Sequence, residues 1–419
     1  MTETIIAILF LVGYLLISLE HPLKMNKSAI AILLAVGCWM IYWMSGVVSV
    51  DEAQLKLSSH LSDVAQIVFF LLAAMTIVEI IDRHNGFLMI TRFIKTNDKK
   101  KLMWIICMLT FFLSAILDNL TTSIVMVAVL KKLIDDKDDR MIMSCLVIIA
   151  ANAGGAFSPI GDVTTTMLWI GGQVSAVNIV KELFLPSLIS LLVPLIYQSF
   201  RIKGNFARPV LENDSENEIA GSRLVFLLGM SCFLSVPIFN HFSNLPPYMA
   251  MLFGLSLIWI ITELLHAKNE ERKHLRVSHM LSKIDLNSLL FFVGILLAVA
   301  CLQTAGILDA LATSLEKHIA NQDIIITTLG LLSSVIDNVP LVAATMGMYP
   351  LHLFPTDSKI WEMIALCAGT GGSILIIGSA AGVVVMGSEK INFMWYFRKI
   401  SFTALIGYLA GVGTYLLFN

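Results

Sequence analysis

The sequence predicts an all-α polytopic membrane protein made of two inverted-topology repeats, and three observations lead to this fold class. Of the 419 residues, 57% are hydrophobic and only 14% are charged. The apolar residues fall in runs of about 20, the length that a helix needs to cross a hydrocarbon core of roughly 30 Å. Two polar motifs inside these runs recur in the second half of the chain at a nearly constant offset. The basic residues are scattered and form no single basic face, so no nucleic-acid partner is expected.

Full-length spans are predicted wherever an apolar run is long enough. In the first half these are residues 5–19, 28–49, 64–81, 141–170 and 183–200. In the second half they are residues 224–240, 247–266, 286–304, 361–386 and 400–417. The first run lacks a basic n-region and a small-residue cleavage site, so we interpret it as a retained span. The six cysteines stand alone inside apolar runs, as is typical of inert packing residues.

Two further stretches, residues 102–130 and 324–349, are too long for one comfortable span and carry Asp-Asn at the middle. A straight helix facing lipid tolerates neither residue there. Non-helical backbone at membrane depth is allowed where it is buried in protein or lines a cavity. Each stretch is therefore predicted to be a re-entrant helical hairpin with Asp-Asn at its tip.

The distribution of basic residues tests this topology. With two hairpins and the amino terminus outside, all but four of the 28 Lys and Arg residues fall on the inner face, the exceptions being Lys56, Lys181, Lys317 and Lys359. If the two long stretches were single spans, each would move everything after it to the opposite side. The charge pattern therefore favours hairpins.

Internal repetition divides the chain in two. Residues 114–119 (SAILDN) match residues 333–338 (SSVIDN), and Gly154-Gly155 with Gly161 match Gly371-Gly372 with Gly378. Five spans and one hairpin per half make an odd number of crossings, so the second half must be inverted. We predict a first repeat over residues 1–200, a cytoplasmic linker over 201–223 and a second repeat over 224–419. In such folds the substrate binds near the midplane, at the repeat interface.

The first group of candidate binding residues lies at the hairpin tips and consists of Asp118, Asn119, Thr121 and Thr122, with Ser333, Asp337 and Asn338 in the second half. Carboxylate, amide and hydroxyl oxygens are hard ligands that suit a hard cation. Asp and Asn are also good helix N-caps, so the same residues have a purely structural interpretation. An aspartate inside the membrane and its duplication favour a functional role.

The second group lies on one broken helix per repeat. Between Asn152 and Asp162 the chain has three glycines and a proline, which cannot sustain a regular helix. An unwound stretch exposes carbonyl oxygens, although glycines also permit close helix packing. The run continues into Thr164 and Thr165. The second half keeps the glycines but has neutral polar residues in place of the acids, and we expect these to be secondary ligands: Thr370, Ser373 and Ser379.

Glu79 interrupts the third span, one turn before Asp82 and Arg83. It is a further candidate, for a proton pathway. A solvated or salt-bridged acid near the inner face explains it equally well.

The chain resembles the NhaD-type sodium/proton antiporters, a group within the ion transporter superfamily that also holds arsenite and dicarboxylate carriers. The resemblance rests on residues 69–82, the two Asp-Asn tips and residues 152–165, and it covers nearly the whole chain. It implies exchange of Na⁺ for H⁺ by alternating access, a homodimer in a bacterial-type inner membrane, and no cofactor, and it leaves open whether Li⁺ is also carried. It also implies a cation site using Asp118, Asn119, Asn152, Asp162, Thr164, Thr165, Ser333, Asp337 and Asn338.

Two alternatives remain besides a channel, which the predicted inverted repeats with broken helices disfavour. An arsenite, oxyanion or dicarboxylate carrier would share the architecture, but dicarboxylate carriers have Ser-Asn-Thr at the tips, where this chain has carboxylates that repel a dianion. No Lys or Arg is expected near either tip to offset them. An intramembrane aspartyl protease would use two buried aspartates to activate water. Such enzymes have Gly-x-Gly-Asp on a helix, whereas Asp162 follows Pro-Ile-Gly.

Overall fold

The computed structural model describes residues 2–18, 25–46, 49–87, 94, 96–202, 204–206, 221–243, 245–267, 275–319 and 321–419. Within these ranges the protein is helical, apart from one isolated bridge between Asp98 and Asn205. Nine of the described helices are long and apolar enough to cross a membrane. The chain is therefore a multi-pass, all-helical membrane protein. Most of the linker predicted at 201–223 lies outside the described residues.

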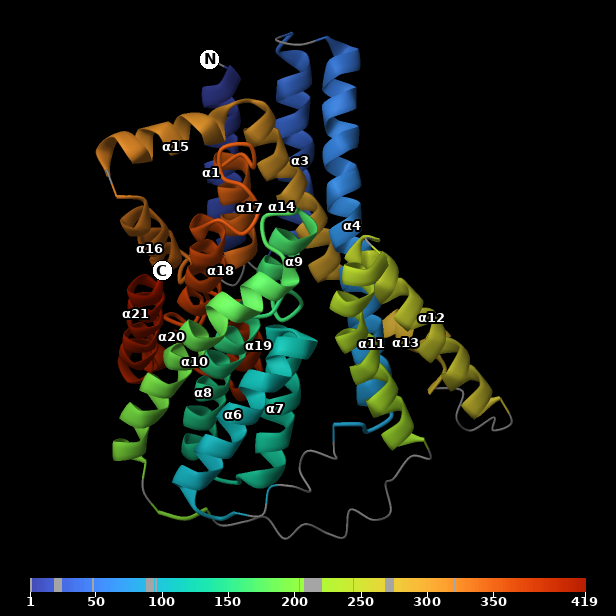
Figure 1. Cartoon of the computed structure of the whole chain (residues 1–419), viewed down its shortest axis with the longest axis vertical. Helices are drawn as coiled ribbons and strands as arrows, with labels where there is room; N and C mark the ends of the chain where they lie inside the picture. The colour runs from blue at the N-terminus through green and yellow to red at the C-terminus, as the bar shows by residue number, and fades with distance from the viewer. Residues whose placement is uncertain are drawn as a thin grey trace.

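The helices are named in chain order in Figure 1. The first half contains α1 (Thr2–Ser18), α3 (Lys27–Met44), α4 (Val50–Arg83), α6 (Lys99–Leu117), α7 (Asn119–Leu133), α8 (Lys137–Ala156), α9 (Val163–Ile170) and α10 (Ala176–Arg201). The second half contains α11 (Ser222–Ser243), α12 (Pro247–His266), α13 (Val277–Met280), the 3₁₀ turn η3 (Leu281–Lys283), α14 (Leu286–Thr304), α15 (Ile307–His318), α16 (Gln322–Leu332), α17 (Asn338–Met348), α18 (Lys359–Gly371), α19 (Ala380–Glu389), α20 (Phe393–Lys399) and α21 (Ser401–Phe418).

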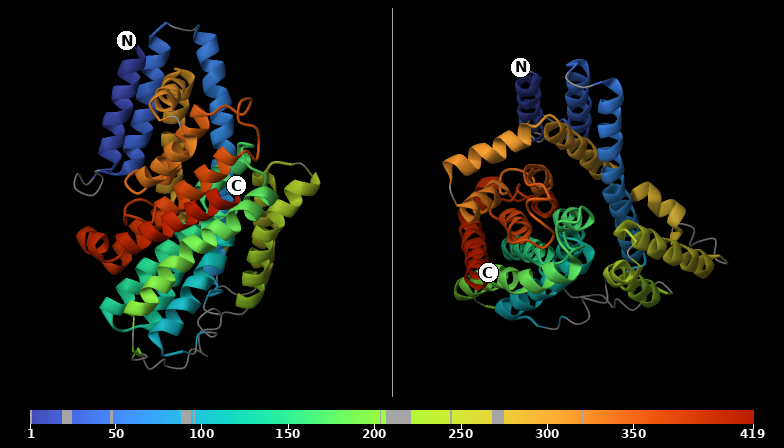
Figure 2. Two further views of the ribbon diagram at one scale, coloured as in Figure 1. Left: turned by 60° about the vertical axis from the view of Figure 1, so that its left-hand side comes forward. Right: turned by 45° about the horizontal axis from the view of Figure 1, so that its top comes forward.

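The central bundle combines helices from both halves of the chain. Helix α10 runs along α21, α8 packs against α6, α7, α18 and α19, and α16 packs against α18. Both views of Figure 2 show these green and orange-red helices side by side. Helices α1, α3 and α14 form a second group, and the long helix α4 connects this group to α11 and α12 (Figure 1). Segments far apart in the sequence are thus brought to one centre.

The helix breaks predicted from the sequence are confirmed. Helix α6 ends at Leu117 and α7 starts at Asn119, and the residue between them, Asp118, has a φ of 84°, far from helical values. The chain also leaves helical geometry between α8 and α9, and again between α18 and α19. Helices α6 and α7, on either side of the first break, pack against each other. On the far side of the second break, α17 packs mainly on α14, α15, α9 and α18 rather than on α16.

Among the differences from the prediction, three have clear local reasons. Helix α4 begins at Val50 rather than at 64, because Ser49 caps it by accepting the Glu52 amide, and acidic residues stabilise its first turn. Helix α3 ends at Met44 rather than at 49, where Gly46 adopts a φ of 66°. Helix α15 was not predicted; Gly306, with a φ of 73°, separates it from α14. Hydropathy alone does not detect these polar and turn signals.

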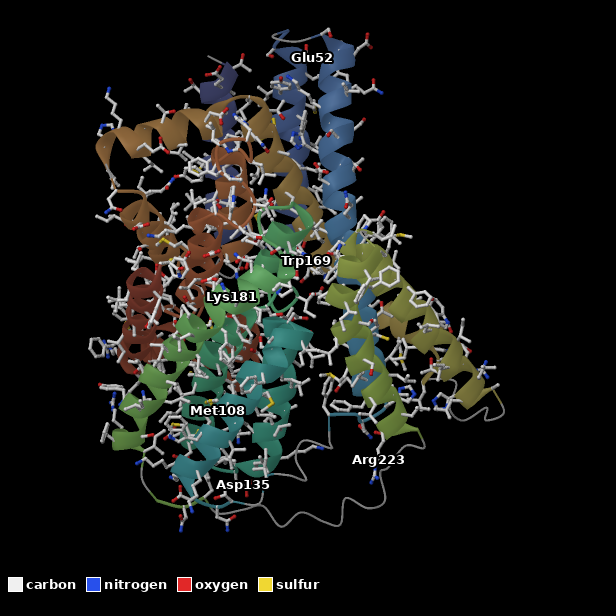
Figure 3. The ribbon with its side chains drawn as sticks, in the orientation of Figure 1. Glu52, Met108, Asp135, Trp169, Lys181 and Arg223 are labelled. Carbon is white, nitrogen blue, oxygen red and sulfur yellow. The ribbon has the colours of Figure 1, made fainter. Side chains whose placement is uncertain are left out.

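Charged side chains mark opposite ends of the molecule. Figure 3 shows Glu52 at one end and Asp135 and Arg223 at the other. Near the Asp135 end, Arg140 donates to Glu389 at 2.9 Å and so ties α8 to the end of α19. The apolar helices lie between these two polar ends.

Candidate ion-binding site

Serine and glycine residues hold the two helix breaks against the neighbouring helices. Ser114 of α6 donates to the carbonyl of Ala151 in α8 at 2.6 Å, and Ser333 donates to the carbonyl of Ala368 in α18 at 2.8 Å. A Cβ on Gly154 would overlap the backbone carbonyl of Phe111, so α8 approaches α6 more closely than any larger residue allows. The same close approach joins α18 to α16, where Gly371 meets Gly330.

This close approach gives a stability prediction. Gly154→Ala should destabilise the protein by about 1–3 kcal/mol, because the added methyl group forces α8 away from α6. The expected result is a fall of several degrees in the Tm of the purified protein in detergent. Gly413→Ala is the matched control, since a Cβ there has nothing within 4 Å. An equal Tm for the two variants would contradict the packing argument.

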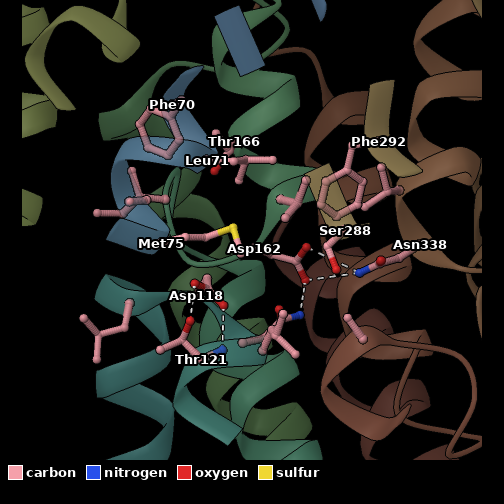
Figure 4. A pocket seen from close by; sticks show the side chains of 18 of the residues that line it. Phe70, Leu71, Met75, Asp118, Thr121, Asp162, Thr166, Ser288, Phe292 and Asn338 are labelled. Atoms are coloured by element: carbon pink, nitrogen blue, oxygen red, sulfur yellow. Dashed lines mark hydrogen bonds between the residues drawn. The ribbon is translucent and has the colours of Figure 1, made fainter. Parts of the chain in front are cut away.

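Asp162 is the point where polar residues from both halves meet. It is 1% exposed, and it accepts the side-chain amides of Asn119 at 2.6 Å and Asn338 at 3.2 Å. It also caps α9 by accepting the backbone N–H of Thr164 at 2.9 Å. Figure 4 shows its carboxylate pointing toward Asn338, with Ser288 beside them. The aspartate thus joins the residue that follows Asp118 to the residue that follows Asp337.

Asn152 makes a second connection between the halves. Its amide nitrogen donates to the hydroxyls of Ser373 and Ser379, each at 2.9 Å. Its amide oxygen accepts from Asn119 at 3.0 Å. Asn152 is fully buried, so all of these bonds form away from solvent. Ser373 and Ser379 of the second half are therefore connected to Asp162 through Asn152 and Asn119.

The two hairpin aspartates cap the helices that follow them. Asp118 accepts the backbone N–H and the hydroxyl of Thr121, both at 2.8 Å. Asp337 accepts the backbone N–H of Val339 at 3.2 Å, and its own N–H donates to the hydroxyl of Tyr14 in α1 at 3.1 Å. The capping interpretation is therefore correct for both residues. It is compatible with ion binding, since each carboxylate also lines the cavity described next.

One cavity contains all three aspartates. Asp118, Asp162 and Asp337 line a space of about 70 Å³, together with Asn119, Asn338 and Thr121. Roughly 10–15 Å³ of such volume holds one water molecule, so the cavity has room for a small, partly hydrated ion. Its remaining lining is mostly apolar and includes Phe70, Leu71 and Met75 (Figure 4).

The other predicted residues surround this cavity or lie apart from it. Thr122 and Thr164 are buried, and their hydroxyls have no hydrogen-bond partner among the described residues. Thr165 donates to the backbone carbonyl of Asp162, and Thr370 to that of Leu366 in its own helix. Glu79 forms an ion pair with Arg83 at 2.7 Å and is not among the residues lining the cavity.

The cavity also contains residues that the sequence did not indicate. Lys27 and Ser288 both line it. The prediction that no basic residue lies near the hairpin tips is therefore wrong. The reason is long-range packing: α14 lies against both α3 and α17, and it brings the first turn of α3 to the tips. The sequence signal for Lys27 is its position at the start of a helix, where a basic residue is unfavourable.

Comparison with known proteins gives a consistent family. A family model described as "Citrate transporter" matches residues 14–361. "Sodium/proton antiporter 2" of Arabidopsis thaliana is 50% identical over 416 residues, covering 98% of each chain. "Na(+)/H(+) antiporter NhaD" of Vibrio cholerae is 33% identical, covering 98% of this chain and 91% of the relative. This chain belongs to the NhaD-type antiporter family.

The sequence matches to NhaD-type relatives include the segments that line the cavity. The matches span both hairpin tips and both helix breaks, because they leave at most a few residues at the ends of the chain. A further NhaD-type relative, "Sodium/proton antiporter 1" of Arabidopsis thaliana, is 49% identical and covers 99% of this chain and 72% of the relative.

Proposed function

We propose that this protein is a secondary transporter that exchanges Na⁺ for H⁺ by alternating access. The observation that carries the proposal is the single small cavity lined by three aspartates with amide and hydroxyl oxygens around them. Hard oxygen ligands and excess negative charge suit a small hard cation. The printed names of the relatives, sodium/proton antiporters, agree with this chemistry.

The exchange follows from the cost of an isolated charge away from water. A buried carboxylate must be paired with a cation or neutralised by a proton. If Na⁺ and H⁺ compete for Asp118, Asp162 and Asp337, binding of one releases the other. A site that crosses the membrane only when neutralised by either cation performs antiport without a separate proton pathway.

The alternative of an anion carrier is less consistent with the cavity. Citrate and other dicarboxylates are negatively charged, and the lining has three carboxylates against one lysine. A protease would need a water held between two aspartates, whereas the hydrogen-bond partners of Asp162 are two asparagines and a backbone N–H. Arsenite, which is neutral at physiological pH, is the best remaining competitor.

A vesicle experiment separates these functions. The full chain is reconstituted in liposomes with an acid interior, monitored with a pH-sensitive dye. Addition of NaCl should dissipate the pH gradient, and choline chloride should not. Dissipation by citrate without sodium would instead identify an anion carrier, and uptake of arsenite that leaves the pH gradient unchanged would identify an arsenite carrier.

Inverted repeats explain why the two halves make the same local contacts. The pair Ser114–Ala151 matches Ser333–Ala368, and in the same way Gly154 meets the backbone of α6 and Gly371 meets that of α16. These matched contacts support a first repeat over 1–200, a linker over 201–223 and a second repeat over 224–419. Each repeat would contribute five spans, one re-entrant hairpin and one broken helix, with the site at their interface.

The proposed orientation places the amino terminus outside a bacterial-type inner membrane. Single cysteines should then react only from the inside at two positions, Lys100 and Asp136, and only from the outside at two others, Ser59 and Asp357. The six native cysteines are buried, so they give little background. Ser215 and Asn244, further positions for this test, lie outside the described residues. Any reversed position would contradict the inverted-repeat topology. We also propose a homodimer, which cross-linking in native membranes tests.

A further inference from the structure

Lys27 occupies an unusual position for a basic residue. It is the first residue of α3, where the partial positive charge of the helix end disfavours a cation. Asn26 already caps this helix by accepting the backbone N–H of Ser28 at 2.8 Å. The Lys27 ammonium lies 4.6 Å from the centre of the Phe291 ring of α14, a cation–π contact that partly offsets the helix-end repulsion. The lysine is therefore held in place by α14.

This position is at the boundary between two cavities. Lys27, Leu120, Ser288 and Ala380 line the small cavity that holds the aspartates, and the same four residues line a neighbouring cavity of about 580 Å³. The larger cavity continues to the start of α3, where Asn26 and Asp285 line it. Lys27 thus lies between the ion cavity and a wider neighbouring space.

We propose that Lys27 is an affinity-determining residue whose charge competes with Na⁺ for the three carboxylates of the ion cavity. The inference rests on the proposed function, because it assigns a residue to the same cation site. A second consequence concerns ion release. The lysine balances part of the negative charge, so the cavity does not bind a cation so tightly that release fails.

Electrostatics sets the size of the effect. Two like unit charges that line one cavity repel each other, and at an effective dielectric constant of about 20 even a separation on the order of 10 Å changes an affinity by roughly tenfold. Removing the lysine charge should therefore strengthen Na⁺ binding. This direction is opposite to that expected from loss of a structural residue, which would weaken binding.

The test measures Na⁺ binding and transport by the full chain. Lys27→Gln and Lys27→Met remove the charge, and Met keeps the aliphatic stem on Phe291. Calorimetric titration with NaCl in detergent should give a Kd about tenfold lower for both variants, and the apparent KM for Na⁺ in vesicles should fall in parallel. Lys27→Arg should stay within twofold of wild type. Lys132→Gln, which removes a charge from the exposed end of α7, is the matched control and should also stay within twofold.

The outcomes are distinguishable. Tighter Na⁺ binding by the two neutral variants alone supports the proposal. Unchanged or weaker binding by both overturns it, as does an equal gain in Lys132→Gln, which would indicate a general surface effect. If wild type neither binds Na⁺ nor dissipates a pH gradient with it, the proposed function itself fails. Tm values close to that of wild type identify the variants that fold. If Lys27→Gln does not fold, Na⁺ binding is measured on Lys27→Met.

Discussion

Asp162→Asn is expected to abolish Na⁺-driven exchange and to weaken Na⁺ binding at least a hundredfold. The carboxylate is buried, and at an effective dielectric constant of about 20 its attraction for a cation about 4 Å away is worth ~4 kcal/mol. The replacement also turns one acceptor oxygen into an N–H donor that faces the donating amides of Asn119 and Asn338. Titration calorimetry with NaCl and the vesicle assay measure the two losses.

Ser379→Ala provides the matched comparison for this loss. The serine accepts from Asn152 and caps α19 through the Gly382 N–H, so its removal also disturbs the site, but no formal charge is lost. We expect a decrease in Na⁺ affinity of tenfold or less. Equal losses in the two variants would mean that the site is more symmetric than the position of the acids indicates.

Asp118→Asn should lose both Na⁺ binding and Na⁺-driven proton release, while Asp337→Asn should lose exchange and keep weak binding. Asparagine imitates a permanently protonated aspartate and is itself a good N-cap, so the contacts of Asp118 with Thr121 can persist and the fold should survive. Asp118 lies beside Asn119 and Asp162, where most of the acids are, whereas Asp337 belongs to the half with neutral polar residues. Proton release is measured with a pH dye in weakly buffered detergent on addition of NaCl.

One outcome would contradict the predictions for both Asp118→Asn and Asp337→Asn. If both variants dissipate the pH gradient normally at equal expression, the hairpin carboxylates are not part of the mechanism. Asp162 would then be the remaining acid to examine.

Local chemistry explains which features the sequence could predict. The breaks at Asp118, at residues 157–162 and at residues 372–379 follow from glycine, proline and capping residues, whose effect acts within a few positions. The convergence of Asn119, Asp162 and Asn338 is what the proposed inverted repeats would produce, since inverted halves bring equivalent segments together at their interface. The residues themselves were therefore identifiable before their contacts were known.

Long-range packing explains the features that the sequence could not predict. Lys27 and Phe291 meet because Gly294 lets α14 lie directly against the backbone of Ala31 in α3. Nothing near Lys27 in the chain indicates that contact. Likewise, the bonds from Asn152 to Ser373 and Ser379 depend on how α8 and α19 cross. Side-chain direction across a helix interface is set by the partner helix, not by the local sequence.

The length of α4 has a practical consequence. At 34 residues it extends about 51 Å at 1.5 Å per residue, longer than the roughly 30 Å hydrocarbon layer even at the largest usual tilts. Its first turns carry Asp51, Glu52 and Lys56, so this end is the part that enters water. The first turns of α4 therefore form a rigid helical extension at one end of the protein. A nanobody raised against that extension would distinguish right-side-out from inside-out vesicles. It would also add a recognisable feature for particle alignment in cryo-electron microscopy without touching the ion cavity.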